Sequence, residues 1–333
     1  MRRRTVLQSS ALLAMSALSA SAFSSCTSQT NSGSDQKPLR VGLIPWIGWH
    51  GTYLADVKGF FKAEGIVVEQ TVFQTVTEVN TALIAKQLDL AWLVAVDLLV
   101  LVAQAPDLKN IMASDYSGDV DAILGRGIAK SQDLKGKTIA REDIPYEVVF
   151  LGQYLRKIGL TEKDVNIVST PVPDGTAAFV AGKVDAVVNY EPFIGKALKE
   201  RKDAKVLFTA KASNIIPNAL AAHSDVLTER RNTVLAYIRA VDKGIKFAAS
   251  NSKEANELIA KWTGVSAADI KDQLSRIVLL DVAANKSIAF NPDNPLNMLA
   301  SIESAAKILR DVGKITKPVD SGSLIDGSLI QAL

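Results

Sequence analysis

Residues 44–66 read "IPWIGWHGTYLADVKGFFKAEGI", a turn rich in glycine and aromatic residues that opens into an amphipathic segment. The residues that lead into it, Leu39–Trp46, are short, branched and apolar, as in a buried strand. Apolar residues spaced along one helical face then predict a helix over residues 52–64, which Gly65 ends as a C-cap. A buried strand that turns directly into such a helix predicts an α/β fold.

The same alternation of apolar runs and amphipathic segments continues along the chain. Further strands are predicted within residues 66–73, 89–94, 109–116, 121–127, 134–143, 165–172, 185–192, 204–210 and 218–227. Further helices are predicted at residues 76–86, 146–158, 174–182, 229–250, 252–262, 267–279 and 295–312. The apolar run over residues 90–105 is short and contains Asp97, so it predicts a buried strand and helix instead of a membrane span. This order favours mostly parallel sheets flanked by helices.

Most of the conspicuous aromatic and acidic residues lie at or just beyond predicted strand ends. Ligands of open α/β sheets bind outside the carboxyl ends of the strands, so such side chains are candidates to line one cleft. Glycines on both sides of Trp49 also allow the backbone to approach a ligand closely. The candidate ligand-binding residues are Trp46, Trp49, His50, Trp92, Asp115, Tyr116, Tyr146, Glu147, Tyr190 and Glu191. For any single ring the alternative is an ordinary place in the core.

Residues that carry out catalysis are scarce. His50 and His223 are the two histidines, and neither has the cysteine or acidic neighbours whose spacing is typical of a metal site. The sequence contains no G-x-S-x-G elbow and no P-loop. These observations predict a protein that is not an enzyme and has no catalytic residue, metal or cofactor.

The first residues have the pattern of an export signal. Arginines at positions 2–4, an apolar run and small residues predict a signal peptide over residues 1–25, which also resembles a twin-arginine signal. Cys26, the single cysteine, follows two serines and resembles the lipobox cysteine of bacterial lipoproteins; the alternative is a stray cysteine beside an ordinary cleavage site. Residues 26–38 are polar and predict a flexible tether. The protein is therefore expected outside the cytoplasm (periplasmic), anchored to the membrane through a lipid on Cys26.

The charge of the chain argues against a nucleic-acid partner. Its 38 lysines and arginines exceed its 35 aspartates and glutamates by three, and Arg2, Arg3 and Arg4 supply that excess. Without the signal the chain is neutral, so it lacks the positive surface that binding to phosphate backbones requires.

Five stretches, in this order, resemble the solute-binding proteins of ABC importers of the nitrate/sulfonate/taurine type. They are "RVGLIPWIGWHGTYLADVKGFFKAEGI", "ALIAKQLDLAWL", "LKGKTIA", "LRKIGLTEKDVNIV" and "AAFVAGKVDAVVNYEPF", and the resemblance spans roughly Leu39 to Trp262. It implies a two-lobed type II periplasmic-binding fold with two hinge strands. Residues 39–118 and 217–333 would form lobe 1, the second range supplying the return strand and C-terminal helices, and residues 119–216 would form lobe 2. It also implies a monomer that captures a small solute between the lobes and delivers it to the transmembrane subunits of a permease.

The acidic residues near the predicted helix at Tyr146 set this chain apart from anion-binding relatives, which commonly offer small hydroxyl residues there. Glu142, Asp143 and Glu147 would repel a sulfonate or nitrate unless they are compensated. Aromatic rings with acids favour an amine, a quaternary ammonium or a nitrogen heterocycle. Inward-facing basic residues would reverse this inference, and the candidates are Arg126, Lys130 and Arg141. The alternatives for function are an enzyme of the same fold acting on a small heterocycle, and a sensory solute-binding lipoprotein.

Overall fold

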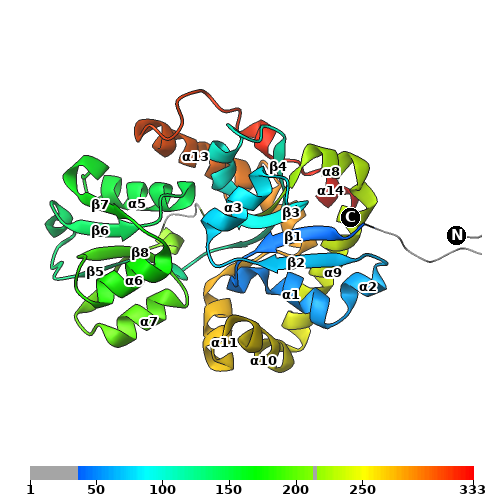
Figure 1. Ribbon diagram of the computed structural model, residues 1–333, viewed down its shortest axis with the longest axis horizontal. Coiled ribbons are helices and arrows are strands. Elements are labelled where there is room, and N and C mark those ends of the chain that lie inside the picture. Colours follow the sequence, from blue (N-terminus) through cyan, green and yellow to red (C-terminus); the bar gives the residue numbers. More distant parts are fainter. Residues whose placement is uncertain (1–36, 213–215) are drawn as a thin grey trace, which may run out of the picture. The chain divides into compact units, whose positions relative to one another are not determined.

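The structure is a computed structural model that describes residues 37–212 and 216–333. The predicted signal peptide, Cys26 and nearly all of the predicted tether lie outside the described residues. Two β-sheets with helices packed around them make up the described part (Figure 1).

The first sheet has six strands in the order β11-β4-β10-β3-β1-β2. Their bounds are β1 Leu39–Leu43, β2 Val68–Val72, β3 Leu90–Val94, β4 Leu108–Tyr116, β10 Pro217–His223 and β11 Val278–Leu279. Strand β1 pairs in parallel with β2 and β3, whereas β10 pairs antiparallel with both β3 and β4. This sheet therefore collects strands from both ends of the described chain.

The second sheet has five strands in the order β7-β6-β8-β5-β9. Their bounds are β5 Asp121–Arg126, β6 Thr138–Arg141, β7 Asn166–Ser169, β8 Ala186–Tyr190 and β9 Ala204–Thr209. Strand β6 pairs in parallel with β7 and β8, and β5 pairs antiparallel with β8 and β9.

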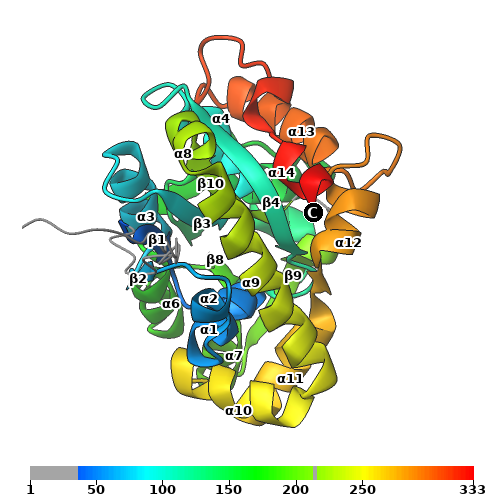
Figure 2. The ribbon, with the colours of Figure 1, turned by 90° about the vertical axis from the view of Figure 1, so that its right-hand side faces the viewer.

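Helices fill the segments between the strands and most of the chain after β10. Those before β10 are α1 His50–Val57, α2 Phe60–Ala63, α3 Val76–Ile84, α4 Leu98–Leu101, α5 Pro145–Lys157, α6 Val172–Val180 and α7 Phe193–Glu200. Those after it are α8 Ser224–Glu229, α9 Arg231–Ser250, α10 Ser252–Thr263, α11 Ala267–Arg276, α12 Val282–Ala284, α13 Met298–Asp311 and α14 Ser328–Ala332. Figure 2 shows the long helix α9 beside α1 and α2.

Each sheet is mixed, where the sequence predicted mostly parallel pairing. Apart from the short edge strand β11, which pairs antiparallel with β4, the antiparallel strands are those next to a change of sheet: β5 follows β4 after a short link, and β10 follows β9. A strand that enters from the other sheet begins at the edge where the parallel strands end, so it runs against them. The chain changes sheet between Tyr116 and Asp121 and returns between Thr209 and Pro217. We call the region around the first sheet lobe 1 and that around the second lobe 2, and keep the ranges 39–118, 119–216 and 217–333 as our proposal for them.

Both faces of the second sheet are buried, because neighbouring residues of β5 belong to different cores. Ala122 and Leu124 pack with Phe179 of α6 and Ala197 of α7. Ile123, which lies between them, belongs to the main core that also holds the apolar side of α5. This alternation along one strand places α5 on one face of the sheet and the pair α6 and α7 on the other.

Three predicted elements end earlier than expected. The helix predicted over residues 267–279 ends at Arg276, and β11 occupies its last two residues. The first helix breaks into α1 and α2 at Gly59, which has a φ of 71°, the left-handed conformation that glycine adopts most readily. The return strand stops at His223, where α8 begins.

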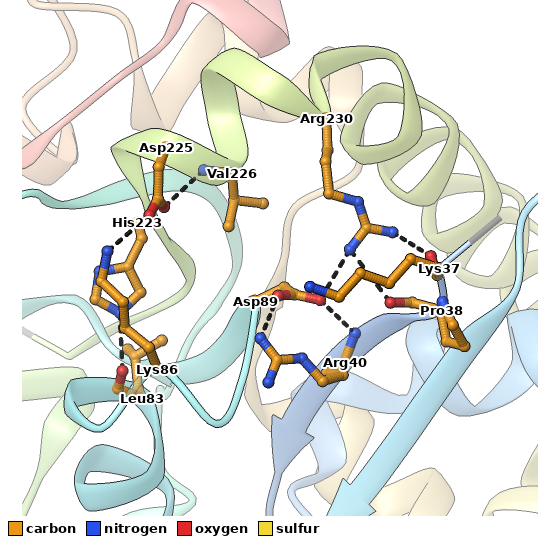
Figure 3. A network of polar contacts seen from close by, with 10 residues as sticks. All are labelled: Lys37, Pro38, Arg40, Leu83, Lys86, Asp89, His223, Asp225, Val226 and Arg230. Carbon is orange, nitrogen blue, oxygen red and sulfur yellow. Dashed lines mark hydrogen bonds and ion pairs between the residues drawn. The ribbon is translucent and has the colours of Figure 1, made fainter.

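Polar contacts fix the start of β1 (Figure 3). The guanidinium of Arg230 donates to the carbonyls of Lys37 at 2.6 Å and Pro38 at 3.2 Å, and to the carboxylate of Asp89 at 2.9 Å. Asp89 also accepts from the backbone and the side chain of Arg40. These contacts hold the start of β1 in lobe 1.

In the described ranges, every helix is too short or too polar to cross a membrane.

Candidate functional site

A small cavity lies where residues from the two lobes meet. It measures about 20 Å³ and is lined by Ile44, Trp46, Trp49, Val76, Val94, Asp121, Tyr146, Tyr190, Ile216 and Asn218. Four of these are candidates from the sequence: Trp46 and Trp49 from the turn after β1, Tyr146 from α5, and Tyr190 from the end of β8. A volume of this size holds about one water molecule. A larger solute therefore enters only if the walls move apart.

Trp46 is the ring that joins the lobes directly. Its indole meets Tyr190 of lobe 2 edge to face, with ring centroids 6.0 Å apart and planes at 82°. Its Nε1–H points at the carboxylate of Asp115, at 3.3 and 3.4 Å from the two oxygens. The turn approaches this carboxylate so closely that a Cβ on Gly48 would lie 1.9 Å from Asp115 Oδ2. Gly48 is therefore required for the position of Trp46.

Asp115 supports the wall of the cavity from behind. It is fully buried and accepts from Ser114 Oγ at 2.7 Å and Asn218 Nδ2 at 2.9 Å, besides Trp46. Burial raises its pKa to about 6, although these hydrogen bonds favour the charged form. The side chain thus fixes two lining residues and does not itself line the cavity.

Asp121 brings a carboxylate to the cavity wall. It is the first residue of β5 and is 4% exposed. Burial raises its pKa to about 7, and the negative charges of Asp115 and Glu191 add to this effect. Trp49 offers a complementary group, because its buried Nε1–H has no acceptor among residues 37–212 and 216–333. The residues around the cavity therefore include an acid, an indole whose N–H is unused, and Asn218, whose Nδ2 donates to Asp115 and Ser117.

Tyr146 lines the cavity with its ring and holds Glu147 beside it. The Tyr146 hydroxyl donates to Glu147 Oε1 at 3.2 Å, and the Glu142 amide donates to Glu147 Oε2 at 2.6 Å. Glu147 is fully buried, and burial together with the charge of Glu142 holds its pKa well above the usual range. Glu147 therefore serves this helix start and does not line the cavity.

Two predicted site residues, Trp92 and His50, point into the core of lobe 1, so the expectation that they line the cleft is corrected. Trp92 Nε1 donates to Thr52 and Tyr237 at 3.0 and 2.9 Å, and the Trp92 ring stacks behind Trp49 at 6.3 Å. His50 is fully buried on the helix side, where its Nδ1 meets the Ile47 carbonyl at 2.8 Å and burial lowers its pKa to about 4.

Tyr116 and Glu191 also lie outside the cavity lining. The Tyr116 hydroxyl donates to the Leu296 carbonyl, which directs the ring towards the C-terminal segment. Glu191 is 8% exposed and accepts from the Gly195 amide at 2.9 Å and from Arg276 of lobe 1 at 3.0 Å. Glu191 is thus part of a contact between lobes, at a different place from the cavity.

The basic residues that would have reversed the charge argument face elsewhere. Arg126 donates to the carbonyls of Gly182 and Val184, and Arg141 pairs with Asp143 and Glu162. In the described part of the chain, no lysine, arginine or histidine lines the cavity. Its one ionisable acid is therefore uncompensated by a neighbouring cation.

Asp121 and Asn218 are the polar lining residues that sequence reasoning missed. Each lies at the amino end of an antiparallel strand, β5 or β10, whereas the rule for parallel sheets points to the carboxyl ends of strands. The signal that could have found them is the predicted hinge itself, since a strand that enters from the other lobe begins at the cleft.

Among the described residues, no group of three His, Cys, Asp or Glu side chains is arranged to hold a metal ion.

The family described as "NMT1/THI5 like" matches residues 46–255, more than half of the chain. The chain belongs to this family. It is 26% identical to the putative aliphatic sulfonates-binding protein of Bacillus subtilis (strain 168) over 310 residues, which cover 89% of this chain and 87% of the relative. It is 25% identical to the riboflavin-binding protein RibY of Chloroflexus aurantiacus over 236 residues, which cover 67% of this chain and 65% of that relative.

Solved structures confirm the fold of this family member. The periplasmic aliphatic sulphonate binding protein SsuA from Escherichia coli superposes with a TM-score of 0.73 at 19% identity, over 87% of this chain and 92% of SsuA. The predicted two-lobed periplasmic-binding fold is thereby confirmed. The fold also occurs in an enzyme: the desulfurization enzyme DSZB superposes with a TM-score of 0.63 at 16% identity, over 89% of this chain and 98% of that chain. Fold alone therefore does not separate a binding protein from an enzyme.

Proposed function

We propose that this protein is the extracytoplasmic solute-binding component of an ABC importer, which captures a small solute between its lobes and delivers it to a permease. The observation that carries the proposal is the cavity lined from both lobes by aromatic rings, an acid and an amide. A solute that touches both lobes stabilises the closed arrangement, which the permease then recognises. Two relatives have names that specify binding of a solute, which supports this role.

The solute that fits this lining is a nitrogen heterocycle or an amine instead of a simple oxyanion. Trp46 and Tyr190 offer ring faces, Asp121 accepts a proton or a hydrogen bond, and the Trp49 N–H is free to donate. A heterocycle with a donor beside an acceptor satisfies both polar groups at once. A sulfonate would instead meet the Asp121 carboxyl with no cation in the lining to offset it.

Isothermal titration of the purified domain tests both parts of the proposal. The panel comprises ethanesulfonate, taurine, nitrate, choline, pyrimidines and riboflavin, after a thermal-shift screen of a metabolite library. We expect a saturable rise in melting temperature and micromolar or tighter binding with a heterocycle or an amine. Submicromolar binding of nitrate or an alkanesulfonate alone contradicts the solute class but not the importer role. Absence of binding across the library contradicts the role itself.

The protein is further proposed to bind its solute without converting it. The cavity lining contains one acid and, within residues 37–212 and 216–333, no histidine, cysteine or lysine, so it offers few groups for acid–base or nucleophilic steps. Incubation of the protein with each hit, followed by mass spectrometry, checks this point. Release of an altered compound in more than stoichiometric amount supports the alternative, an enzyme of the same fold.

The lipid anchor at Cys26, the monomeric state and the permease partner are also proposals. A cysteine directly after a signal-like segment and before a polar tether supports anchoring. Replacement Cys26→Ala should move the exported protein from the membrane fraction to the soluble fraction. Retention of the variant in membranes contradicts the anchor, whereas co-purification with a sensor kinase in place of a permease supports the sensory alternative.

A further inference from the structure

The amino end of helix α5 lies at the edge of the cavity, because its second residue, Tyr146, is one of the lining residues. The helix spans 13 residues, Pro145–Lys157, and begins after Ile144, which makes no side-chain cap. Pro145 has no N–H, so the first amide available to a partner is that of Tyr146, whose ring lines the cavity. An amide in this place, with the partial positive charge of a helix start, attracts a negatively charged group.

A carboxylate of the protein itself occupies this amide. Asp97 Oδ1 accepts from the Tyr146 N–H at 3.0 Å. Asp97 belongs to lobe 1, where it ends the short turn Ala95–Asp97 after β3, and it is fully buried. Its other oxygen, Oδ2, accepts from Asn80 Nδ2 of α3 at 3.4 Å. One carboxylate thus joins the frame of lobe 1 to the first free amide of a lobe 2 helix.

Among the described residues, the Tyr146 amide and the Asn80 side chain are the hydrogen-bond donors to the Asp97 carboxyl group. In the described part of the chain, no lysine or arginine pairs with it. Burial raises the pKa of Asp97 to about 7, the charge of Glu142 adds to this shift, and the hydrogen bonds from Asn80 and the Tyr146 amide oppose it. Thr77, one turn before Asn80 on α3, donates its hydroxyl to Glu142. The same face of α3 therefore donates to Asp97 and to Glu142, which lies in the loop before α5.

We propose that a carboxyl oxygen of Asp97 occupies the amino end of α5 when the lobes close and so excludes anionic solutes from that position. The inference deepens the proposed solute class and rests on the proposed function. It makes Asp97 a residue that determines specificity without belonging to the cavity lining. It also accounts for a neutral or cationic solute in a chain whose named relatives include a sulfonate-binding protein.

The test compares three variants with ethanesulfonate as the probe, by isothermal titration at low ionic strength. Asp97→Ser shortens the side chain and frees the Tyr146 amide, so we expect ethanesulfonate to bind at least about tenfold tighter than to the wild type. Asp97→Asn keeps an oxygen on that amide and should show no such gain. The new amide nitrogen at position 97 can donate to Asn80 Oδ1 if the side-chain amide of Asn80 flips. That oxygen has no hydrogen-bond partner among the described residues. Asp174→Ser removes an exposed acid from the first turn of α6 in the same lobe and should also show no gain.

Two results overturn the proposal: equal affinities for Asp97→Ser and wild type, or an equal gain in Asp97→Asn and Asp97→Ser, which would make charge alone the cause. Because the Asp97 side chain is buried, melting temperatures establish that each variant folds. If Asp97→Ser does not fold, the wild type decides by NMR: the Tyr146 amide resonance should not move with ethanesulfonate, and a saturable shift contradicts the proposal. Titration of the wild type with choline and pyrimidines tests the proposed function separately. Binding of these solutes to the wild type does not depend on how the variants change the affinity for ethanesulfonate.

Discussion

Replacement of Asp121 by asparagine should raise the free energy of unfolding at neutral pH. The increase should be smaller at acidic pH. Burial, with the charges of Asp115 and Glu191, raises the pKa of Asp121 from its ordinary 3.8 to about 7. A carboxyl whose pKa is raised by folding favours the folded state below the unfolded pKa, and this advantage is lost as the pH rises through the folded value. At neutral pH the wild type therefore carries a destabilising charge that asparagine removes.

The size of the effect follows from the two pKa values. The difference between 3.8 and about 7 corresponds to roughly 4 kcal/mol at about pH 8, and relaxation around the charge makes about 2–4 kcal/mol the expected gain. At about pH 4.5 most of the folded-state carboxyl is protonated, and the gain should shrink to about 1 kcal/mol. Asparagine has the same shape and keeps an oxygen as acceptor, so packing changes little.

Urea denaturation of wild type and Asp121→Asn at the two pH values measures this difference. The matched control is Asp115→Asn, because Asp115 is equally buried but accepts from Ser114, Asn218 and Trp46. An amide there replaces one acceptor oxygen by a donor, so Asp115→Asn should gain less than Asp121→Asn or lose stability. A gain for Asp121→Asn that is equal at both pH values, or a loss at about pH 8, would refute the reasoning.

Three further replacements test the frame around the cavity. Gly48→Ala should lower the melting temperature strongly, because the new Cβ would lie 1.9 Å from Asp115 Oδ2; a normal melting temperature contradicts the close approach. Arg276→Ala removes the 3.0 Å ion pair with Glu191 between the lobes, so small-angle scattering should give a larger radius of gyration, and an unchanged radius contradicts a role in closure. Arg230→Ala removes the donors that hold the start of β1, so amide exchange in the first residues of that strand should become faster than in the wild type, while β8 remains protected; equal exchange contradicts the anchoring.

The elements of the fold could be predicted from the sequence because their signals are local. Most strands of the two sheets lie within short apolar runs, and each long helix follows an amphipathic period, but β11 lies where the sequence predicted the end of a helix. The break at Gly59 could not be predicted in the same way, because a glycine inside a helical period is compatible with a continuous helix. The strand directions at β5 and β10 depend on which sheet the chain enters next, and local periodicity does not contain that information.

The candidate site was predictable where one geometric rule applied. Trp46, Trp49, Tyr146 and Tyr190 lie at strand ends or helix starts on the cavity side, so position along the chain was enough to find them. Trp92 lies at the centre of β3, two residues before the strand ends. Its ring therefore packs behind Trp49 and donates to groups in the helices of lobe 1, while Val94 at the strand end lines the cavity.

Two kinds of contact govern binding here, and they should be separable by experiment. A solute wider than water enters the cavity of about 20 Å³ only when the lobes separate, which breaks the contacts of Asp97 with Tyr146 and of Arg276 with Glu191. Contacts that hold the lobes together shift the closing equilibrium, so weakening Arg276 should reduce the affinity for every solute by one common factor. In the proposed site the cavity rings and Asp121 touch the solute itself, so changing them should alter the ratio of affinities for different solutes. Asp97 combines both effects, because it holds the lobes and fills the place of an anion, and its replacement should therefore weaken closure while it widens the range of solutes that bind.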